Sequence, residues 1–403
     1  MSGCPSVPIG EIVHVLGGGT PTRSNSDYYG GDIPWVTPKD MKTWDIRRAQ
    51  IGITQRGLEN SAARLVPENS VLIVVRSGVL KHTLPVGLNR VPVAINQDMK
   101  ALVCSDDVDP NYLAHFIKGR SDTILTWVRA TTADNFPIDN LKQLPIPLPS
   151  LDEQLRIVSL LVQADALRAK RREAITLLDD LAQSFFYNMF DDLATNARGW
   201  DDSLSLGDVA EVTSGITKGR KVSGALRPVP YMAVLNVQDK MLDLSVVKEI
   251  EATEAEIQRY RLLKDDLLLT EGGDPDKLGR GTLWQNELPE AIHQNHIFRV
   301  RLRPDSKVEP NFLNWLLASE RGRRYFLRSA KQTTGIASIN ATQLRQFPLV
   351  VPPLVLQNEF AVRLGKIKAH KSTQQAHLAE LDNLFASLQQ RAFRGELWDT
   401  RDN

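Results

Sequence analysis

The chain has 403 residues, a formal net charge of +1 and ordinary apolar (42%) and charged (24%) fractions. These values predict a globular protein of two or three domains and exclude a chain that is basic along its whole length. The two cysteines, Cys4 and Cys104, lie far apart; they predict no disulfide or zinc site and favour a reducing, cytoplasmic compartment. No signal-peptide pattern and no apolar run of membrane-spanning length is present, so we expect no membrane contact.

The main feature of the sequence is an internal repeat. Residues 144–154 return as residues 347–357, at a shift of 203 positions (357 − 154). Other segments follow in the same order: residues 9–15 match 206–212, 18–23 match 215–220, 33–35 match 229–231, 94–97 match 291–294, and 110–113 match 310–313. Preserved order over this length indicates duplication, and a repeat of this size predicts two similar modules.

In chain order, the first module occupies residues 1–150, with a strand at Val71–Val75 and a helix at Asn111–Gly119. A long helical spacer follows at 151–192. The second module occupies residues 193–350, with strands at Leu267–Thr270 and Ile297–Leu302 and a helix at Asn311–Glu320. A second spacer follows at 351–397. Short strands separated by Gly, Pro and Asn, together with helices, predict an α/β (α+β) fold for both modules.

Each spacer carries apolar residues at steps of three and four and has no proline after its entry, which predicts one helix of about 60 Å at roughly 1.5 Å per residue. Two such helices most simply pair as an antiparallel coiled coil that separates the modules under pseudo-twofold symmetry. The residues expected to pack are Leu161, Ala164, Leu167, Leu178, Leu181 and Phe185, and Leu364, Ile367, Leu381, Leu384 and Leu388. The basic run 168–172 interrupts the first stripe and is expected to face solvent, with a DNA or partner contact as the alternative.

These features resemble the specificity (S) subunit of type I restriction–modification systems. The resemblance covers nearly the whole chain and rests on Ile33–Trp35, on residues 71–78 and 94–98, and on the proline-rich helix entries at 147–154 and 351–357. It implies two target-recognition domains that each read one half of a bipartite double-stranded DNA target. It also implies helices that dock two methyltransferase subunits and, through them, restriction–translocase subunits. S-adenosylmethionine and ATP with Mg²⁺ are then expected on the partner subunits, and no cofactor on this chain.

Residues that contact DNA are expected on loops, where basic side chains reach phosphates or guanine and threonines reach phosphates or thymine methyl groups. In the first module the candidates are Thr20, Thr22, Arg23, Arg76, Ser77, Lys81, His82, Thr131 and Thr132. In the second they are Thr217, Lys218, Arg220, Lys221, Lys277, Arg280, Thr333 and Thr334. For each, an ordinary solvated loop residue is the alternative. The basic segment 321–328 fits a phosphate contact and a structural amphipathic helix equally well.

No segment of the sequence predicts catalysis. Val351–Leu354 lacks the polar first and aromatic last residues of an amino-methyltransferase motif, and Gly17–Gly19 lacks a dinucleotide fingerprint. His293 and His296 stand at helical spacing, but a metal needs further ligands. We therefore expect no catalytic residue and no metal. A methyltransferase or nuclease acting alone, a reader in a related methyltransferase system and a scaffold without DNA are the competing functions.

Overall fold

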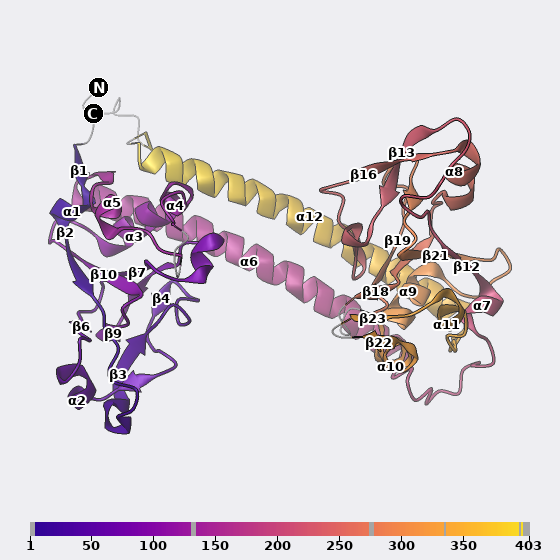
Figure 1. The fold of residues 1–403 in the computed structure, drawn as a ribbon, viewed down its shortest axis with the longest axis horizontal. Helices are drawn as coiled ribbons and strands as arrows, with labels where there is room; N and C mark the ends of the chain where they lie inside the picture. Colours follow the sequence, from indigo (N-terminus) through magenta and orange to yellow (C-terminus); the bar gives the residue numbers. More distant parts are fainter. Residues whose placement is uncertain (1–4, 130–133, 274–277, 334–335, 395, 398–403) are drawn as a thin grey trace. The chain divides into compact units, whose positions relative to one another are not determined.

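The computed structural model describes residues 5–129, 134–273, 278–333, 336–394 and 396–397, and it mixes helices with sheets (Figure 1). The chain divides into two compact units. Unit 1 comprises Met1–Glu173 and Gln374–Asn403, and unit 2 comprises Ala174–Thr373. Helices α6 (Leu151–Phe190) and α12 (Leu354–Ala392) therefore each contribute residues to both units.

Unit 1 contains a five-stranded sheet of order β2-β10-β7-β8-β4, a four-stranded sheet of order β5-β3-β9-β6 and the pair β1-β11. The strands are β1 Ser6–Pro8, β2 Val13–Gly17, β3 Tyr29–Val36, β4 Asp45–Ile46, β5 Gly52–Ile53, β6 Leu65–Val66, β7 Val71–Val74, β8 Val86–Asn89, β9 Val93–Ile95, β10 Met99–Cys104 and β11 Pro145–Pro147. The helices are α1 Ile9–Ile12, α2 Gln55–Glu59, α3 Pro110–Gly119, α4 Ser121–Leu125 and α5 Ile138–Lys142, with short 3-10 turns at Ser26–Tyr28 and Gly78–Lys81. The four-stranded sheet and α2 lie at the end of the unit away from α6 (Figure 1).

The core of unit 1 lies between the five-stranded sheet and its helices. All four residues of β7 are fully buried, so the apolar run predicts its strand correctly because both of its faces are covered. Helix α3 packs on β7 and β8. It begins where the Asp109 carboxylate accepts the Tyr112 backbone N–H and Pro110 takes the first helical turn, an N-terminal arrangement that both residue types favour.

Unit 2 contains a four-stranded sheet of order β12-β21-β17-β19, three-stranded sheets of order β16-β13-β20 and β18-β23-β22, and the hairpin β14-β15. The strands are β12 Ala210–Ser214, β13 Arg227–Met232, β14 Val237–Gln238, β15 Met241–Leu242, β16 Lys248–Ala252, β17 Leu267–Thr270, β18 Gly272–Gly273, β19 Gly281–Leu283, β20 Ile292–His293, β21 Ile297–Leu302, β22 Lys331–Thr333 and β23 Ile336–Ser338. The helices are α7 Leu206–Val209, α8 Glu254–Tyr260, α9 Pro310–Ala318, α10 Glu320–Ser329 and α11 Ala341–Arg345, with a 3-10 turn at Val234–Asn236.

The main sheet of unit 2 repeats the strand order of unit 1, because β12-β21-β17-β19 corresponds to the first four strands of β2-β10-β7-β8-β4. Its strands β17 and β21 have the predicted bounds. The predicted helix 311–320 ends earlier, at Ala318, and α10 begins at Glu320. An aromatic cluster closes the core: the Phe190 ring lies 4.8 Å from Phe312 and 5.5 Å from Phe360, in edge-on geometries that aromatic pairs prefer.

Each long helix is attached to its unit by one fully buried glutamine. The Gln154 amide oxygen accepts the Asp109 N–H (2.9 Å), and its NH₂ donates to the carbonyls of Asp107 (3.0 Å) and Pro149 (2.9 Å). Gln357 makes the same three bonds in unit 2, to the Glu309 N–H and the carbonyls of Lys307 and Pro352. The glutamine at each helix entry therefore fixes the long helix, by hydrogen bonds, to the loop that precedes α3 or α9. We call this set of three hydrogen bonds the glutamine latch.

The two long helices pair in antiparallel directions within unit 1. Arg168 Nε donates to Asp382 Oδ1 (2.5 Å), its guanidinium lies 4.4 Å from the Phe385 ring centroid, and Arg171 donates to Gln374 (2.6 Å). The Arg168 side chain is only 18% exposed. The expectation that the basic run faces solvent is therefore wrong for Arg168 and Arg171, which fill the packed face between the helices.

One heptad pattern connects buried or half-buried positions along both helices. In α6 its buried or half-buried members are Gln154, Ile157, Leu161, Ala164, Arg168, Arg171, Ile175, Leu178, Ala182 and Phe185. In α12 they are Gln357, Phe360, Leu364, Ile367, Lys371, Gln374, Leu378, Leu381, Phe385 and Leu388. The polar contacts repeat as well, since Lys371 pairs with Asp179 in unit 2 (2.6 Å) as Arg168 pairs with Asp382 in unit 1. Alternating steps of three and four are the spacing of helices that pack along their length.

Three residues predicted on this face do not lie there. Leu167, Leu181 and Leu384 are 52%, 42% and 49% exposed. The buried positions include Arg168 and Arg171 instead. The buried face is therefore shifted by one residue from a stripe drawn through apolar residues alone. The other predicted positions, Leu161, Ala164, Leu178, Phe185, Leu364, Ile367, Leu381 and Leu388, are buried or half-buried.

Acid is expected to weaken unit 1 through His115. Its imidazole stacks on Trp44 (4.5 Å), its Nε2 is buried without a hydrogen-bond partner among the described residues, and burial lowers its pKa to about 4. Between the unfolded pKa of about 6.5 and the folded pKa, the unfolded chain binds a proton that the folded chain does not, so stability falls as pH falls. From pH 7.5 to 5.5 the loss is about 1.3 kcal/mol. The free energy of unfolding should be measured for H115Q and for the parent at both pH values. H115Q should lose about 1.3 kcal/mol less than the parent between these pH values. An equal loss in both proteins would contradict the expectation.

Candidate nucleic-acid interface

The first candidate loop follows β2 and is held by aromatic side chains. Trp35 Nε1 donates to the Gly19 carbonyl (3.0 Å) and the Tyr29 hydroxyl donates to the Pro21 carbonyl (2.6 Å). The Thr20 hydroxyl donates to the Gln97 amide oxygen. Thr22 and Arg23 are exposed at the tip of the loop. The repeat residues Trp35 and Gln97 thus fix the loop backbone and leave Thr22 and Arg23 facing solvent.

The second candidate segment of module 1 is largely engaged by acidic neighbours. Arg76 Nε pairs with Asp98 Oδ1 (2.5 Å), and Lys81 lies 3.7 Å from Asp134. The Ser77 hydroxyl accepts the Val79 N–H and caps the 3-10 turn that follows, and Lys81 and His82 are exposed. In both pairs the basic side chain is the more exposed partner, at 46% for Arg76 and 63% for Lys81, and the aspartate is largely covered. Thr131 and Thr132 lie outside the described residues.

In module 2, the matching loop projects Thr217, Lys218 and Lys221 into solvent. The Lys218 ammonium lies 4.9 Å from the ring centroid of Tyr231 in strand β13, a cation–π contact between the loop and the strand. Arg220 differs from its neighbours, because its guanidinium turns inward to Glu256 and its side chain is 19% exposed. The loop therefore combines exposed candidates with one inward-facing arginine.

Two of the remaining candidates of module 2, Arg280 and Thr333, lie within the described residues. Arg280 is half-buried, donates to the Gln238 amide oxygen (2.9 Å), and keeps a buried Nε that has no partner in the described part of the chain. The backbone of Thr333 ends strand β22. Lys277 and Thr334 lie outside the described residues.

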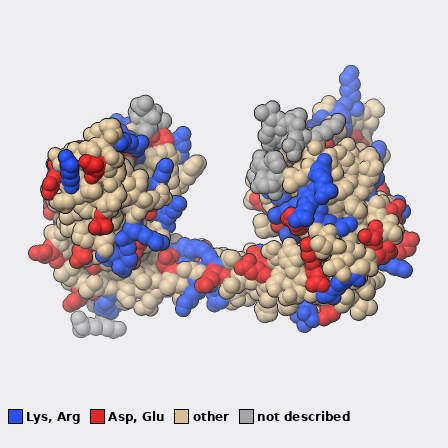
Figure 2. All heavy atoms as spheres, turned by 90° about the horizontal axis from the view of Figure 1, so that it is seen from below, with Lys and Arg blue, Asp and Glu red and all other residues tan. Residues whose placement is uncertain are grey.

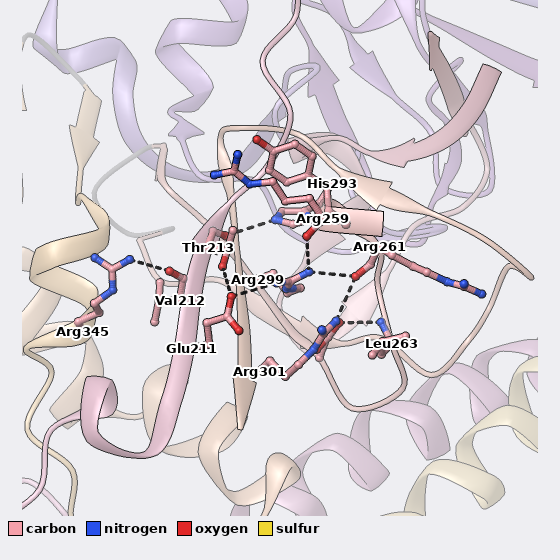
Figure 3. A network of polar contacts seen from close by, with 12 residues as sticks. Glu211, Val212, Thr213, Arg259, Arg261, Leu263, His293, Arg299, Arg301 and Arg345 are labelled. Carbon is pink, nitrogen blue, oxygen red and sulfur yellow. Dashed lines mark hydrogen bonds and ion pairs between the residues drawn. The ribbon is translucent and has the colours of Figure 1, made fainter. Parts of the chain in front are cut away.

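Sequence reasoning missed two arginines that anchor helix α8, the buried Arg299 and the half-buried Arg301. Arg299 donates to the carbonyls of Arg259 (3.1 Å) and Arg261 (3.0 Å), and Arg301 donates to the Arg261 carbonyl (3.0 Å) (Figure 3). Arg301 also donates to both carboxylate oxygens of Asp266 (2.7 Å each). The carbonyls at a helix C-terminus lack partners within the helix, so these arginines satisfy them. The visible signal was the alternation of arginine with apolar residues in Ile297–Leu302, since a charged residue in a buried strand requires a partner.

His293 and His296 face different partners. His293 is fully buried, with its ring nitrogens 3.1 Å from the Tyr260 carbonyl and 3.3 Å from the Thr213 carbonyl, and burial lowers its pKa to about 4. His296 Nδ1 contacts Glu271 instead (2.8 Å). Among the described residues, no group of three or more potential His, Cys, Asp or Glu ligands gathers around a common point.

The basic segment 321–328 is helix α10, and much of it packs inward. Arg321 donates to the carbonyls of Pro348 and Leu193 (3.1 Å each), and the Tyr325 hydroxyl donates to the Gln343 carbonyl (2.7 Å). Phe326 is fully buried. These contacts favour the structural alternative for this segment, and they leave Arg323 and Arg328 exposed.

Charge is intermixed on the surface. On the face drawn in Figure 2, basic and acidic side chains occur together over each unit, as expected for a formal net charge of +1. Exposed loop cations such as Arg23, Lys218 and Lys221 are local positive charges of the kind that contact phosphates, and phosphate contacts supply the salt-dependent part of DNA affinity. Among the described residues, no helix is both long enough and apolar enough to cross a lipid bilayer.

Comparison with known proteins shows similarity to one family. Residues 1–177 match the family model described as the type I restriction modification DNA specificity domain. The EcoR124I/EcoR124II specificity subunit of Escherichia coli is 36% identical over 178 residues, which are 43% of this chain and 44% of that subunit, so the match spans less than half of that relative. The StySPI specificity subunit of Salmonella potsdam is 23% identical over 418 residues, covering 98% of this chain and 89% of that subunit.

A solved structure has the same fold. The S subunit of a type I restriction–modification system from M. genitalium superposes with a TM-score of 0.54, at 14% identity, over 96% of both chains. The resemblance seen in the sequence agrees with three findings. These are the domain match over residues 1–177, the relatives aligned along almost the whole chain, and the shared fold. The chain is thus similar to the DNA specificity domain of type I restriction–modification systems over residues 1–177, and to specificity subunits of such systems along almost its whole length.

Proposed function

We propose that this chain reads a bipartite double-stranded DNA target and carries no catalytic activity of its own. The module at 1–150 reads one half of the target and the module at 193–350 reads the other. The supporting observation is duplication at every level: the strand order β2-β10-β7-β8 returns as β12-β21-β17-β19, and the latch of Gln154 returns at Gln357. A reader built twice suits a target that has two halves.

The spacers at 151–192 and 351–397 separate the modules as an antiparallel coiled coil in this proposal. Support comes from the common heptad of α6 and α12 and from the repeated ion pairs Arg168–Asp382 and Asp179–Lys371. Two methyltransferase subunits dock on this helical region, and restriction–translocase subunits join through them. S-adenosylmethionine and ATP with Mg²⁺ then act on those partners, in the cytoplasm where the DNA lies.

The proposal is tested by mapping methylated bases in cells with and without this gene, with the methyltransferase gene present in both. Gene-dependent methylation should appear at sites that consist of two short defined sequences separated by a gap of fixed length. A continuous target, or methylation that does not depend on the gene, would contradict the bipartite reading. The map also supplies the target sequence, which loop geometry and DNA deformation determine jointly.

The purified chain is expected neither to methylate nor to cut DNA, because the sequence carries no cofactor loop or catalytic motif and the described candidates are loop cations, threonines, a serine and a histidine. The measurement is transfer of labelled methyl groups from S-adenosylmethionine to target DNA, and cleavage with Mg²⁺ and ATP. Adding the methyltransferase subunits to the same preparation is the positive control and should restore transfer. Methyl transfer by the chain alone, in a preparation free of other proteins, would refute the expectation.

A further inference from the structure

The loop 215–224 of module 2 carries the exposed candidates Thr217, Lys218 and Lys221. Within this loop Arg220 is held from three sides. Its Nε and Nη2 donate to the two oxygens of Glu256 (2.5 and 2.8 Å), Nη2 donates to the Glu251 carbonyl (3.0 Å) and Nη1 to the Thr217 carbonyl (3.3 Å). A bidentate guanidinium–carboxylate pair fixes orientation as well as distance. Arg220 therefore closes the loop on itself and ties it to strand β16 and helix α8.

Glu256 is itself fixed by the start of helix α8. Its carboxylate accepts the Thr253 N–H (2.9 Å), while the Thr253 hydroxyl accepts the Glu256 N–H (3.3 Å), which makes a reciprocal capping box. The hydrogen bond from Arg220 is the main cause that lowers the pKa of Glu256 to about 2, so the pair stays charged at neutral pH. The acceptor for Arg220 thus belongs to the framework of α8 and not to a free side chain.

The other end of α8 is fixed to the main sheet of unit 2. Arg299 and Arg301 of β21 bind the carbonyls of Arg259 and Arg261, where α8 ends (Figure 3). Arg299 is 3% exposed. A continuous set of polar contacts therefore runs from β21 through α8 and Glu256 to Arg220. Side chains placed on such supported elements hold their geometry within the narrow limits that recognition requires.

Module 1 lacks this device at the matching position. Arg23, which the repeat aligns with Arg220, is exposed, and no ion pair to it is found among the described residues. Helix α2 begins at the capping Thr54 as α8 begins at Thr253, but its third residue is Gly57 and not glutamate. A Cβ on Gly57 would lie 2.5 Å from the Tyr28 carbonyl oxygen, so no glutamate fits there. The repeat therefore aligns two arginines that have different surroundings.

We propose that Arg220 is a positioning residue for the second half of the target: through Glu256 it fixes the loop that presents Thr217, Lys218 and Lys221 to DNA. Arg23, its counterpart in the repeat, contacts a phosphate directly. This inference rests on the proposed function, because it assigns the way in which the second module achieves its specificity. It also explains why one of two repeat-equivalent arginines is turned away from solvent.

The test uses the full chain assembled with its methyltransferase subunits and a DNA duplex that carries the target found by methylation mapping. The variants are R220K, R220A and E256Q. E256Q keeps the capping box because glutamine serves there as well as glutamate. The matched control is E249Q, which removes one negative charge from the exposed surface of neighbouring strand β16. Binding is measured for the intact target and for duplexes altered in one half, over a range of salt concentrations, and thermal unfolding is recorded for each variant.

If Arg220 positions the loop, R220K and E256Q should each weaken binding to the intact target roughly tenfold and reduce discrimination at the second half only. Their effects should not add in the double variant, and the salt dependence should remain parental. A lysine cannot replace the bidentate contact, although it binds phosphate well. R23A should instead reduce the slope of log affinity against log salt by about 0.9 and affect all duplexes alike.

Three results would overturn the proposal. The first is the pattern expected of a direct phosphate contact by Arg220. In that pattern R220K binds the target almost as well as the parent, and R220A reduces the slope of log affinity against log salt. E256Q then binds at least as tightly as E249Q. Equal loss on all duplexes with lowered thermal stability would indicate a merely structural role. An unchanged salt slope in R23A would remove the contrast between the two arginines. If the parental complex shows no sequence-specific binding at all, the proposed function fails, and the role of Arg220 that rests on it fails with it.

Discussion

A chain in which residues 1–150 are replaced by the equivalent module of a relative is expected to methylate a new set of sites that share only one half of the parental target. The reason is that unit 1 has its own closed core, in which the β7 residues and the α3 residues Tyr112, Leu113 and Phe116 are fully or almost fully buried. Two mismatched base pairs alone, at ~1–3 kcal/mol each, weaken binding by roughly 30-fold to more than 10,000-fold. Methylation at parental sites should therefore fall to background.

The exchanged module must keep its contacts with the helices. The Phe393 ring lies 5.3 Å from Tyr112 and 5.1 Å from Phe116, and Gln389 donates to the His115 carbonyl. A donor module with matching residues at these positions and at the Gln154 latch avoids a folding defect that would imitate a change in specificity. Exchange of residues 193–350 is the reciprocal control and should change the other half. If either exchange alters both halves of the target, the modules are not independent readers.

Elements with a dominant local signal could be predicted from sequence. Helix α6 begins at the predicted residue 151 and ends at 190, two residues before the end of the predicted spacer 151–192, because apolar periodicity and the preceding prolines act over neighbouring residues. Strands β7 and β17 are short apolar runs that only a sheet covered on both faces accommodates. The repeat also predicted that the same elements would occur twice. These features are encoded within a few residues of one another, so the sequence alone is sufficient for them.

Contacts between distant residues could not be predicted in this way. Arg168 lies on the packed face because Asp382 and Phe385, more than 200 positions later, receive it. A stripe drawn only through apolar residues passes through Leu167, which is exposed. Likewise, Arg23 and Arg220 are equivalent in the repeat, and only Glu256, which lies 36 positions after Arg220, distinguishes them. Long polar side chains can face either way, and their partners decide which way they face.

Proline at Leu178 is expected to break helix α6 and to weaken assembly with the methyltransferase subunits while unit 1 stays folded. Leu178 is half-buried and packs against the core of unit 2, about two thirds of the way along the helix. A proline inside a helix removes a backbone hydrogen bond and clashes with the preceding turn, at a cost of ~3 kcal/mol or more. In our proposal the partners dock on the helical region, so a break there removes the docking surface without altering the module at 1–150.

The measurement is co-purification of the methyltransferase subunits with L178P, together with thermal unfolding of the free chain. L178A is the matched control for packing, since it removes the side chain and keeps a strong helix former. L177A is the control for position, because the neighbouring Leu177 is 59% exposed and its loss should change stability by less than about 0.5 kcal/mol. L178A should retain the partners at reduced stability, and L178P should lose them. Undiminished co-purification with L178P would show that the partners dock on the modules, and that the helices serve only to connect them.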